Sequence, residues 1–513
     1  MPPTRQLATA LGAAAFALAA HASSADAFCG FYVSGSGQKL VNDATEVVLV
    51  RDGTRTVLSM QNDYKGPLED FAMVVPVPVV LHEKDVKTLP KTVFDHTDAL
   101  GSPRLVEYWE QDPCPVLAPR PTSMASRGAA APAADAAFEG APRKKDAVKI
   151  EARFDVAEYK ILILSATDSA GLERWLHDNH YQIPDGAEPL LRPYVEGGSK
   201  FFVAKVDPKK VQLRAGHAAL SPIRFHYDSE DFSLPIRLGM ANSSGKQDLI
   251  VNIISPDKRY ELANYKNVFV PTNFDVKPAV KGRFAEFYAA LFDRTVAANP
   301  GAVVTEYAWT AVPNYHCDPC TDADVSDPDL MTLGGDVVGG PIATGNFVLT
   351  RLHARYGAND MKDDLRFRVA RPVVGGREHW AGHGLEYGAA PSTQNFFQAR
   401  YAIRHAWTGP IACTNPQRGV WGGPPSGEGQ QVVAAGQLAF APRGRLEIAS
   451  VIKRDLPEIG VRRDAAPVPP PSGADTPRFA QPPRKAQSLG AGTAIGGLML
   501  VGMWLMRRRR TGR

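Results

Sequence analysis

Cysteine is scarce in this chain, which has five in 513 residues. A small secreted scaffold held together by disulfides needs a far denser set, so that class is excluded. The sequence also lacks a Gly-x-Ser-x-Gly nucleophile elbow, a phosphate-binding glycine loop with lysine, and a His-Glu-x-x-His zinc helix. These absences weigh against several enzyme classes but do not exclude catalysis, because triads are defined by geometry rather than by local sequence.

Positive charge is concentrated at the C-terminal end. The formal net charge is +4, of which Arg507–Arg510 and Arg513 supply +5, while Arg5 and Asp26 cancel. The residues between the two ends therefore carry a formal charge of −1, and they contain no basic run. Nucleic-acid binders present a basic patch or stripe to the phosphates, so no nucleic-acid partner is expected.

The N-terminal residues follow the three-part pattern of a secretory signal. Arg5 precedes an apolar run from Leu7 to Ala20, and Ala25-Asp26-Ala27 is a small-residue cleavage site. The apolar run is shorter than the roughly 20 residues that span a bilayer as a helix. We therefore predict a signal peptide at residues 1–27, and its removal would leave Phe28 as the first mature residue.

The C-terminal residues predict a membrane anchor. Leu489 to Met506 carries no charge and is followed at once by Arg507–Arg510. A helix of this length is about 27 Å long, close to the hydrocarbon thickness of a bilayer. Arginines cluster on the cytoplasmic side of spanning helices, so we expect the tail inside, the main domain outside, and the membrane as a partner.

Composition divides the rest of the chain. Leu117 to about Asp146 is rich in alanine, proline and serine, which is typical of a flexible linker or surface insertion. The predicted segments are a signal peptide (1–27), an N-terminal β-rich block (28–116), an Ala/Pro-rich segment (117–146), a main α+β block (147–460), a Pro-rich linker (461–487), a transmembrane helix (488–506) and a basic cytoplasmic tail (507–513). The predicted fold class is α+β, with a predominantly antiparallel, β-rich outer domain and a few helices.

In the N-terminal block, Thr45–Arg51 and Thr54–Met60 predict a hairpin around Asp52-Gly53, a pair that suits a type I′ turn. Phe71–Val80 contains two prolines, which favours an edge strand or a strand exit. A helix is expected over Lys84–Leu100, interrupted at Pro90.

In the main block, Tyr159–Leu164 predicts a buried strand, and Asp168 is placed to cap the helix that follows. The clearest helix is Val280–Ala298, with aromatic residues along one face. Further strands are expected at 200–206, 223–227, 234–240, 249–254, 267–270, 303–312, 347–356, 365–370, 396–407, 431–440 and 446–451.

Two of these strands alternate basic and apolar residues. The basic positions are Arg351, His353 and Arg355 in the first strand and Arg400 and Arg404 in the second. Such alternation is typical of a half-exposed strand, so we expect these side chains on a solvated face.

His316-Cys317-Asp318-Pro319-Cys320 is the stretch with the most chemical character. Two cysteines at this spacing suit a structural disulfide, a redox pair or half of a metal site. An acidic loop follows the second cysteine, rather than the helix that a thioredoxin-like pair would open, and no second ligand pair exists for zinc. All three interpretations stay open, and the candidate metal ligands are His316, Cys317, Cys320, Asp322 and Asp324.

All five cysteines fall in the exported part of the chain, where an oxidising environment favours pairing. The disulfide candidates are Cys29, Cys114, Cys317, Cys320 and Cys413. An odd number leaves one cysteine over, and the spacing does not assign the pairs. No residue set that would hold a cofactor is predicted, and no catalytic residue is assigned.

Several short motifs resemble a bacterial family, the domain of unknown function 2330. They are Phe28-Cys29-Gly30-Phe31-Tyr32-Val33, Asp112-Pro113-Cys114, Leu164-Ser165-Ala166, Trp175-Leu176 and Tyr181. The resemblance runs from Phe28 to about Trp407 and departs mainly in the Ala/Pro-rich segment. It implies an exported bacterial protein and transfers no catalytic residue. The C-terminal helix with its arginines also resembles bacterial C-terminal sorting signals, some of which are removed by processing.

Two functions follow as hypotheses. The first is a non-enzymatic envelope protein, tethered to the membrane, that binds or scaffolds a protein or envelope polymer outside the inner membrane. The second is an enzyme that uses Cys317 and Cys320, a thiol-disulfide oxidoreductase or another enzyme class. The oligomeric state is not indicated.

Overall fold

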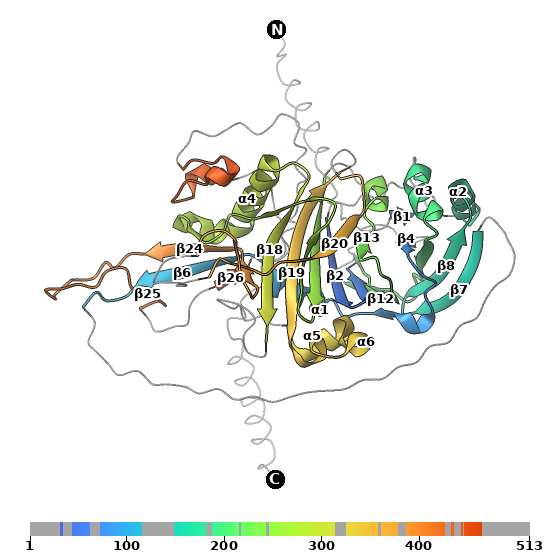
Figure 1. Cartoon of the computed structure of the whole chain (residues 1–513), viewed down its shortest axis with the longest axis horizontal. Coiled ribbons are helices and arrows are strands. Elements are labelled where there is room, and N and C mark those ends of the chain that lie inside the picture. The colour runs from blue at the N-terminus through green and yellow to red at the C-terminus, as the bar shows by residue number, and fades with distance from the viewer. Residues whose placement is uncertain are drawn as a thin grey trace, which may run out of the picture. The chain divides into compact units, whose positions relative to one another are not determined.

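The computed structural model describes residues 31–33, 44–61, 72–114, 148–179, 181, 187–214, 217–242, 246–312, 325–357, 361–377, 386–425, 432–434, 443–444 and 446–463 (Figure 1). The predicted signal peptide, Ala/Pro-rich segment, transmembrane helix, cytoplasmic tail and Cys317 loop lie outside these ranges. Among the helices within them, none combines the length and the apolar composition that crossing a bilayer requires.

The largest sheet is mixed and is buried on both faces. Its strands are rich in valine, isoleucine and leucine, which fit a pleated surface packed from two sides. Their order is β22 (Ala390–Pro391), β21 (Val373–Gly375), β23 (Phe396–Gln398), β18 (Ala302–Ala311), β19 (Phe347–Tyr356), β14 (Gln247–Ser255), β2 (Ala44–Asp52), β3 (Arg55–Met60), β12 (Ile223–Asp228) and β5 (Val86–Thr88), with β16 (Lys266–Phe269) also pairing with β18. β14 lies between β2, which is parallel to it, and β19, which is antiparallel.

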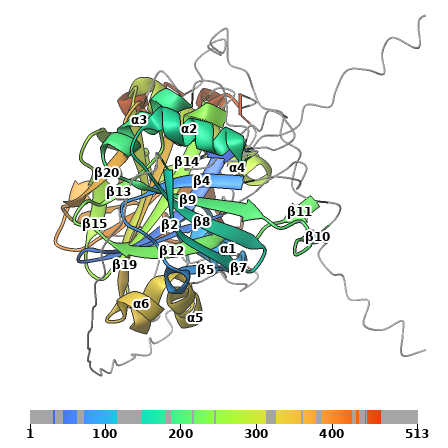
Figure 2. The ribbon, with the colours of Figure 1, turned by 90° about the vertical axis from the view of Figure 1, so that its right-hand side faces the viewer.

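A five-stranded antiparallel sheet packs on one face of the large sheet. Its order is β1 (Phe31–Val33), β4 (Ala72–Val77), β9 (Lys200–Val206), β8 (Tyr159–Ala166) and β7 (Val148–Val156). Alternate side chains of the two sheets, such as Leu49 and Phe202, share one core. The other face of the smaller sheet is covered by α2 (Ser169–Asp178) and α3 (Glu188–Glu196), with Leu172 and Leu191 buried against it (Figure 2).

Helices cover the opposite face of the large sheet. α4 (Phe284–Ala298) packs over Ile250 and Val304, and α1 (Thr92–Gly101) packs over Val48 and Ile254. The short helices α5 (Asp327–Leu330) and α6 (Asp336–Val338) follow along the same face, next to β2 and β3 (Figure 1). Strand alternation therefore divides each central strand between two cores.

A third sheet lies beside α4. Its strands are β17 (Phe274–Asp275), β24 (Arg400–His405), β6 (Arg104–Glu110) and β25 (Trp421–Gly422), with β26 (Val432–Ala434) on β6. β6 and β24 are parallel neighbours although they come from opposite ends of the domain. Two smaller sheets are β13 (Ser233–Leu234), β20 (Leu365–Ala370) and β15 (Arg259–Leu262), and the pair β10 (Gln212–Arg214) and β11 (His217–Ala219).

The predicted class of a β-rich α+β domain is confirmed in its coarse form, and the sheets are mixed. The predicted hairpin is confirmed as β2–β3, and the strand at Tyr159–Leu164 as part of β8. The predicted type I′ turn at Asp52-Gly53 is wrong, because Asp52 pairs with Arg55 and the turn residues are Gly53 and Thr54, of which only Gly53 has a positive φ. Asp168 caps α2 by accepting the N–H of Gly171, as the sequence predicts. α4 begins at Phe284, because a 3₁₀ helix forms the first turn of the predicted segment (Pro278–Arg283).

Three element predictions are wrong, one of them being the strand expected at residues 446–451, where a 3₁₀ helix occupies Ile448–Ser450. Lys84–Leu100 is not one interrupted helix: a 3₁₀ turn (Glu83–Asp85) and strand β5 precede Pro90, and only α1 after it is helical. The cause is tertiary, since β5 pairs with β12 and the sheet overrides the local helical pattern. Leu234–Met240 is not a strand either, because β13 ends at Leu234 and a 3₁₀ helix occupies Leu238–Asn242.

The Ala/Pro-rich segment does not separate two sheets. β2 from the first block pairs with β14 from the second, and β4 pairs with β9. Pro76 opposes Phe201 near the end of β4, so the predicted strand exit is confirmed while the first half of β4 is paired on both sides.

Candidate functional site: a buried charge network beneath α4

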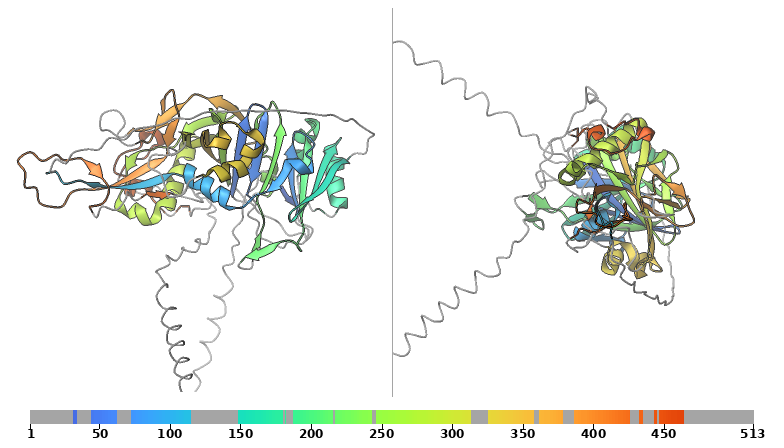
Figure 3. Two further views of the ribbon diagram at one scale, coloured as in Figure 1. Left: turned by 90° about the horizontal axis from the view of Figure 1, so that it is seen from below. Right: turned by 90° about the vertical axis from the view of Figure 1, so that its left-hand side faces the viewer.

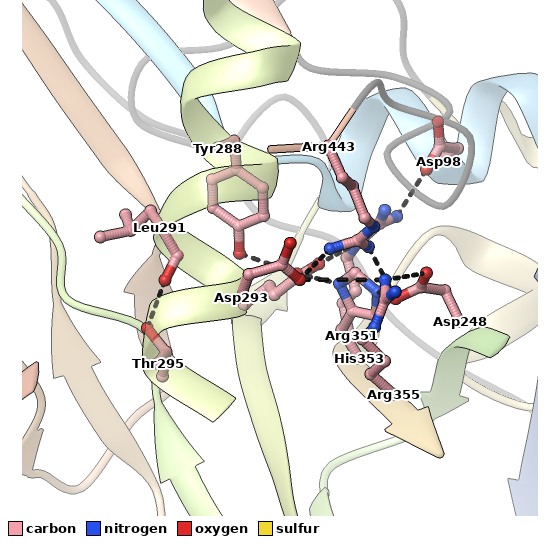
Figure 4. Close-up of polar contacts among 11 residues, drawn as sticks. Asp98, Asp248, Tyr288, Leu291, Asp293, Thr295, Arg351, His353, Arg355 and Arg443 are labelled. Carbon is pink, nitrogen blue, oxygen red and sulfur yellow. Dashed lines mark hydrogen bonds and ion pairs between the residues drawn. The ribbon is translucent and has the colours of Figure 1, made fainter. Parts of the chain in front are cut away.

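The basic residues of β19 do not lie on a solvated face, so that prediction is wrong. Arg351 is 0% exposed and His353 is 1% exposed, and Arg400 on β24 is equally buried. The reason is that β14 and β18 flank β19 on both sides while α1 and α4 cover the face that carries the charges. Buried charges require partners, and the partners are carboxylates on these same neighbours (Figure 4).

Glu306 is the centre of this network. The register of β18 against β19 shifts between Thr305 and Tyr307, so Glu306 is the extra residue of a β-bulge, a device that redirects a side chain. Its carboxylate accepts hydrogen bonds from the Tyr288 hydroxyl at 2.7 Å and from Arg351 Nε at 2.8 Å. His353 Nδ1 lies 2.6 Å from the same carboxylate.

The His353 ring is held on three sides. Its Nδ1 faces Glu306 and its Nε2 lies 3.1 Å from Asp248 Oδ1 on β14. The ring stacks on Phe292 of α4, with centroids 3.7 Å apart and planes 14° apart. Burial alone would lower the pKa of His353, but the two carboxylates raise it above the ordinary value, so the imidazolium is the favoured form.

Arginines close the network at its outer edge. Asp248 accepts a hydrogen bond from Arg355 NH1 at 3.0 Å and forms an ion pair with Arg443 at 2.8 Å. Arg443 also pairs with Asp293 on α4. Burial raises the pKa of Asp293, and the two arginines act against that rise.

A second arm of the network reaches α1. Arg351 NH1 donates to Asp98 Oδ1 at 2.7 Å, and Asn252 donates to the Glu46 carboxylate at 2.9 Å. Gly101 allows this approach, since a Cβ there would lie 3.3 Å from Arg351 Cδ. Burial, together with the charge of Asp98, raises the pKa of Glu46 well above its usual value.

The carboxylates differ in protonation because their partners differ. Burial would raise the pKa of Asp248, but Arg443, Arg355 and His353 lower it to about 2. Burial would also raise the pKa of Glu306, but His353 and Arg351 lower it to about 2. The network therefore contains two acids whose pKa is lowered (Asp248 and Glu306) and two whose pKa is raised (Glu46 and Asp293).

This geometry joins secondary-structure elements rather than presenting a reactive group. Both nitrogens of His353 are engaged, and Glu306 is fully buried, so neither has an open position toward a solvent-borne substrate. The network ties β14, β18 and β19 to α1 and α4. Among the residues that the structure describes, no group of three or more histidines, cysteines and acids is placed to hold a metal ion.

Sequence reasoning missed this network, although a signal was present. Glu306 is the only charged residue between Val303 and Trp309, a run that is otherwise apolar or aromatic except for Thr305. A single charge within a fully apolar strand indicates a buried partner. The sequence of one strand does not say which oppositely charged residue on another strand is that partner.

The candidate metal ligands His316, Cys317, Cys320, Asp322 and Asp324, and the cysteine Cys29, lie outside the described residues. Of the disulfide candidates, Cys114 and Cys413 form a bond, with Cα atoms 5.6 Å apart across a sequence separation of 299. Their pairing lies at the far end of the third sheet, where β6 continues into Cys114.

A surface loop after β24 is organised by a single carboxylate, Glu110. It accepts two hydrogen bonds from Arg418, at 2.7 and 2.8 Å, and the backbone N–H groups of Gly419 and Trp407, at 2.8 and 3.0 Å. These donors, with Arg418 first, lower the pKa of Glu110 to about 2. The disulfide at Cys413 fixes the middle of the same loop.

Comparison with known proteins gives one match. A family model described as an uncharacterized protein conserved in bacteria, the domain of unknown function 2330, matches residues 23–368. The chain belongs to this family. No curated protein and no solved structure matches.

The match to the domain of unknown function 2330 ends within β20. It includes Glu306, Arg351 and His353, and β6 of the third sheet. β23, β24 and the Cys413 loop lie beyond it, although β23 pairs with β18 and β24 with β6. The fold of this family member therefore extends past the matched residues.

Proposed function

We propose that this protein is exported to the bacterial cell envelope, is tethered to the inner membrane by a helix at residues 488–506, and uses its outer domain to bind or scaffold an envelope component. The sequence pattern at both ends supports export and tethering. Membership of a family conserved in bacteria supports the bacterial setting.

The observation that carries the proposal is the Cys114–Cys413 disulfide. These cysteines are 299 positions apart, and their Cα separation of 5.6 Å lies in the middle of the range that disulfides adopt. Disulfides persist in oxidising compartments and are rare in the cytosol. A bond that joins the segments following the parallel strands β6 and β24 fits a protein that folds outside the cytoplasm.

Binding rather than catalysis is favoured by the charge network. Catalytic acids and bases need access to the reacting atoms. The ionisable side chains of the network around Glu306 are instead buried, and they form hydrogen bonds and ion pairs with one another. A domain stiffened in this way suits a scaffold.

The test is a topology measurement on the full chain expressed in a bacterium. Spheroplasts are treated with protease from outside, and free thiols are blocked before non-reducing electrophoresis. We expect protease added outside the spheroplasts to digest the outer domain. We also expect Cys114 to be bonded to Cys413. A double Cys114→Ser, Cys413→Ser variant should lose the mobility shift that reduction causes. Protection of the domain in intact spheroplasts, or fully reduced cysteines, would overturn the proposal.

The oxidoreductase hypothesis gains one specific point. Because Cys114 and Cys413 bond to each other, neither is a fixed partner for Cys317 or Cys320. Differential alkylation against a series of thiol buffers separates the two functions. An oxidoreductase requires the Cys317–Cys320 pair to cycle while Cys114–Cys413 stays oxidised, whereas a structural pair stays oxidised throughout.

A further inference from the structure

Residues 406–420, here called the apolar loop, connect β24 toward β25 and differ from ordinary surface chain. Arg418 is their only charged residue, and its charge is matched by Glu110. Ile411 is 43% exposed and Val420 is 49% exposed. The loop also exposes the uncharged polar residues Thr414, Asn415 and Gln417, so it combines exposed apolar side chains with the absence of free charge.

The apolar loop is also built to hold its shape. Besides the four hydrogen bonds to Glu110, the disulfide fixes Cys413, and the N–H of Gln417 donates to the carbonyl of Pro113 at 2.8 Å. The N–H of Gln111 donates to the carbonyl of Val420 at 2.8 Å. Figure 1 and the left panel of Figure 3 show the chain running out past the end of β24 here. Organisation of this kind lowers the ordering cost of binding.

Aromatic rings lie at the base of the loop. Trp407 is the second residue of the loop and Trp421 follows its last residue; both are half-buried, and the Arg404 guanidinium lies 4.8 Å from the Trp421 ring centroid. Tryptophan is enriched where a protein meets the headgroup region of a bilayer. The nearby free carboxylate is Asp112, which accepts the N–H of Cys114 at the foot of the loop and so limits insertion to a shallow depth.

We propose that the apolar loop inserts its tip into the surface of the membrane that holds the C-terminal helix. This inference rests on the proposed tether. The described domain ends at Arg463 and the predicted helix begins at residue 488, so 24 residues join them. As a Pro-rich chain at about 3.1 Å per residue they reach up to roughly 75 Å, enough for the domain to turn and lie on the bilayer. Ile411 and Val420 then enter the interface, with Trp407 and Trp421 at headgroup level.

The lack of free charge distinguishes a lipid surface from a protein partner. Protein interfaces are centred on tryptophan and tyrosine together with arginine that pairs across the interface. The one arginine of the apolar loop is already bound to Glu110. Because the loop is neutral, its insertion should not depend on anionic lipid.

The experiment uses the full chain reconstituted in phosphatidylcholine vesicles, with brominated acyl chains as tryptophan quenchers. The variant Trp407→Phe lacks this one tryptophan. The difference in bromine-quenchable fluorescence between wild type and this variant is therefore the signal that Trp407 contributes. Trp175→Phe on α2 is the matched control, since Trp175 is also half-buried but lies over the five-stranded sheet. We expect Trp407→Phe to lose quenchable signal and Trp175→Phe to lose none. Ile411→Asp should reduce the quenching of Trp407 at least twofold.

Each outcome decides a point. If the chain does not float with the vesicles, the tether and this inference both fail. If it floats but Trp407→Phe loses no quenchable signal, the tether stands and only the inference fails, which leaves the apolar loop to a protein partner. If quenching of Trp407 rises more than twofold on adding phosphatidylglycerol, attraction to anionic headgroups replaces neutral insertion. Equal quenching with and without phosphatidylglycerol supports the proposal.

Discussion

Two buried glutamates each organise a set of donors, but the donors differ in exposure. Glu306 accepts hydrogen bonds from Tyr288 and Arg351 and faces His353 in the interior, whereas Glu110 accepts from the half-exposed Arg418 and from two backbone N–H groups. The pKa of each falls to about 2. The Glu306 charge and its partners are all desolvated, whereas Glu110 is paired with an Arg418 side chain that is 49% exposed, so water screens that ion pair. Equal pKa values therefore hide unequal contributions to global stability.

Removing the interior carboxylate should have the largest effect. Glu306→Gln leaves the Arg351 and His353 charges short of a buried partner, and breaking such a pair costs about 3–5 kcal/mol in the free energy of unfolding. Urea denaturation of wild type and variant measures it. Glu286→Gln on α4, which removes a carboxylate paired with the half-exposed Arg283, is the control and should cost less than about 1 kcal/mol. Similar losses in both variants would show that the interior network adds nothing beyond a surface pair.

Breaking the disulfide should rank second. The double variant Cys114→Ser, Cys413→Ser releases a bond that closes a long loop, with an expected loss of about 2–4 kcal/mol. Thermal unfolding measures the loss, and a reducing agent should lower the wild-type midpoint but not that of the double variant. A reductant effect on the double variant would mean that another cysteine pair supports the fold.

The pH dependence should separate the interior network from the loop. The pKa of His353 is raised, so its contribution is complete below the unfolded value of about 6.5 and is lost as pH rises through the folded value. The pKa of Glu46 is also raised in the folded state. Its contribution to stability is therefore likewise lost as pH rises, starting from its unfolded pKa of about 4.3. Asp248 and Glu306, with pKa values of about 2, lose their contribution as pH falls below about 4. Stability should peak on the acid side of neutrality.

Urea denaturation at pH 5.5 and at pH 8.5 tests this prediction. We expect the higher denaturation midpoint at pH 5.5. His353→Gln should reduce the difference between the two, because it removes the imidazolium. A flat profile in wild type would contradict the assigned protonation states.

The smallest global effect should come from Glu110→Gln, which acts on the apolar loop alone. Weakening its hydrogen bonds should speed trypsin cleavage after Arg418, the only cleavage site between Trp407 and Trp421, while the unfolding midpoint changes little. Glu107→Gln on the same strand faces Lys281 and His405 and is the matched control. Faster cleavage in both variants would mean that the whole sheet, rather than the loop, has loosened.

Local sequence predicted much of the scaffold. The β2–β3 hairpin, the cap at Asp168 and several buried strands follow from turn chemistry and periodicity, although the turn lies at Gly53-Thr54 rather than at Asp52-Gly53. Local sequence could not predict which strands that are distant along the chain pair with one another. Arg351 and His353 have the alternation of a solvated strand, and only the neighbouring β14 and β18 convert that face into an interior.

The same limit explains the wrong helix before Pro90. The residues of β5 favour a helix on local grounds, and pairing with β12, more than 130 residues away, decides otherwise. The bulge at Glu306 likewise depends on the β19 register and has no local signature. The candidate site was therefore hidden from sequence, while the disulfide candidates were named but not paired.

The parallel pairing of β6 with β24 bears on how the chain acquires its structure. Arg104 pairs with Arg400, so the partner of the first residue of β6 lies 296 positions further along the chain. At synthesis rates of about 5–20 residues per second, that interval lasts roughly 15–60 s. Throughout it, the edge of β6 that β24 later covers stays open in a chain whose apolar strands favour aggregation. A protein of this topology should depend on holding chaperones while it emerges, and a version truncated at residue 368 would never close that edge.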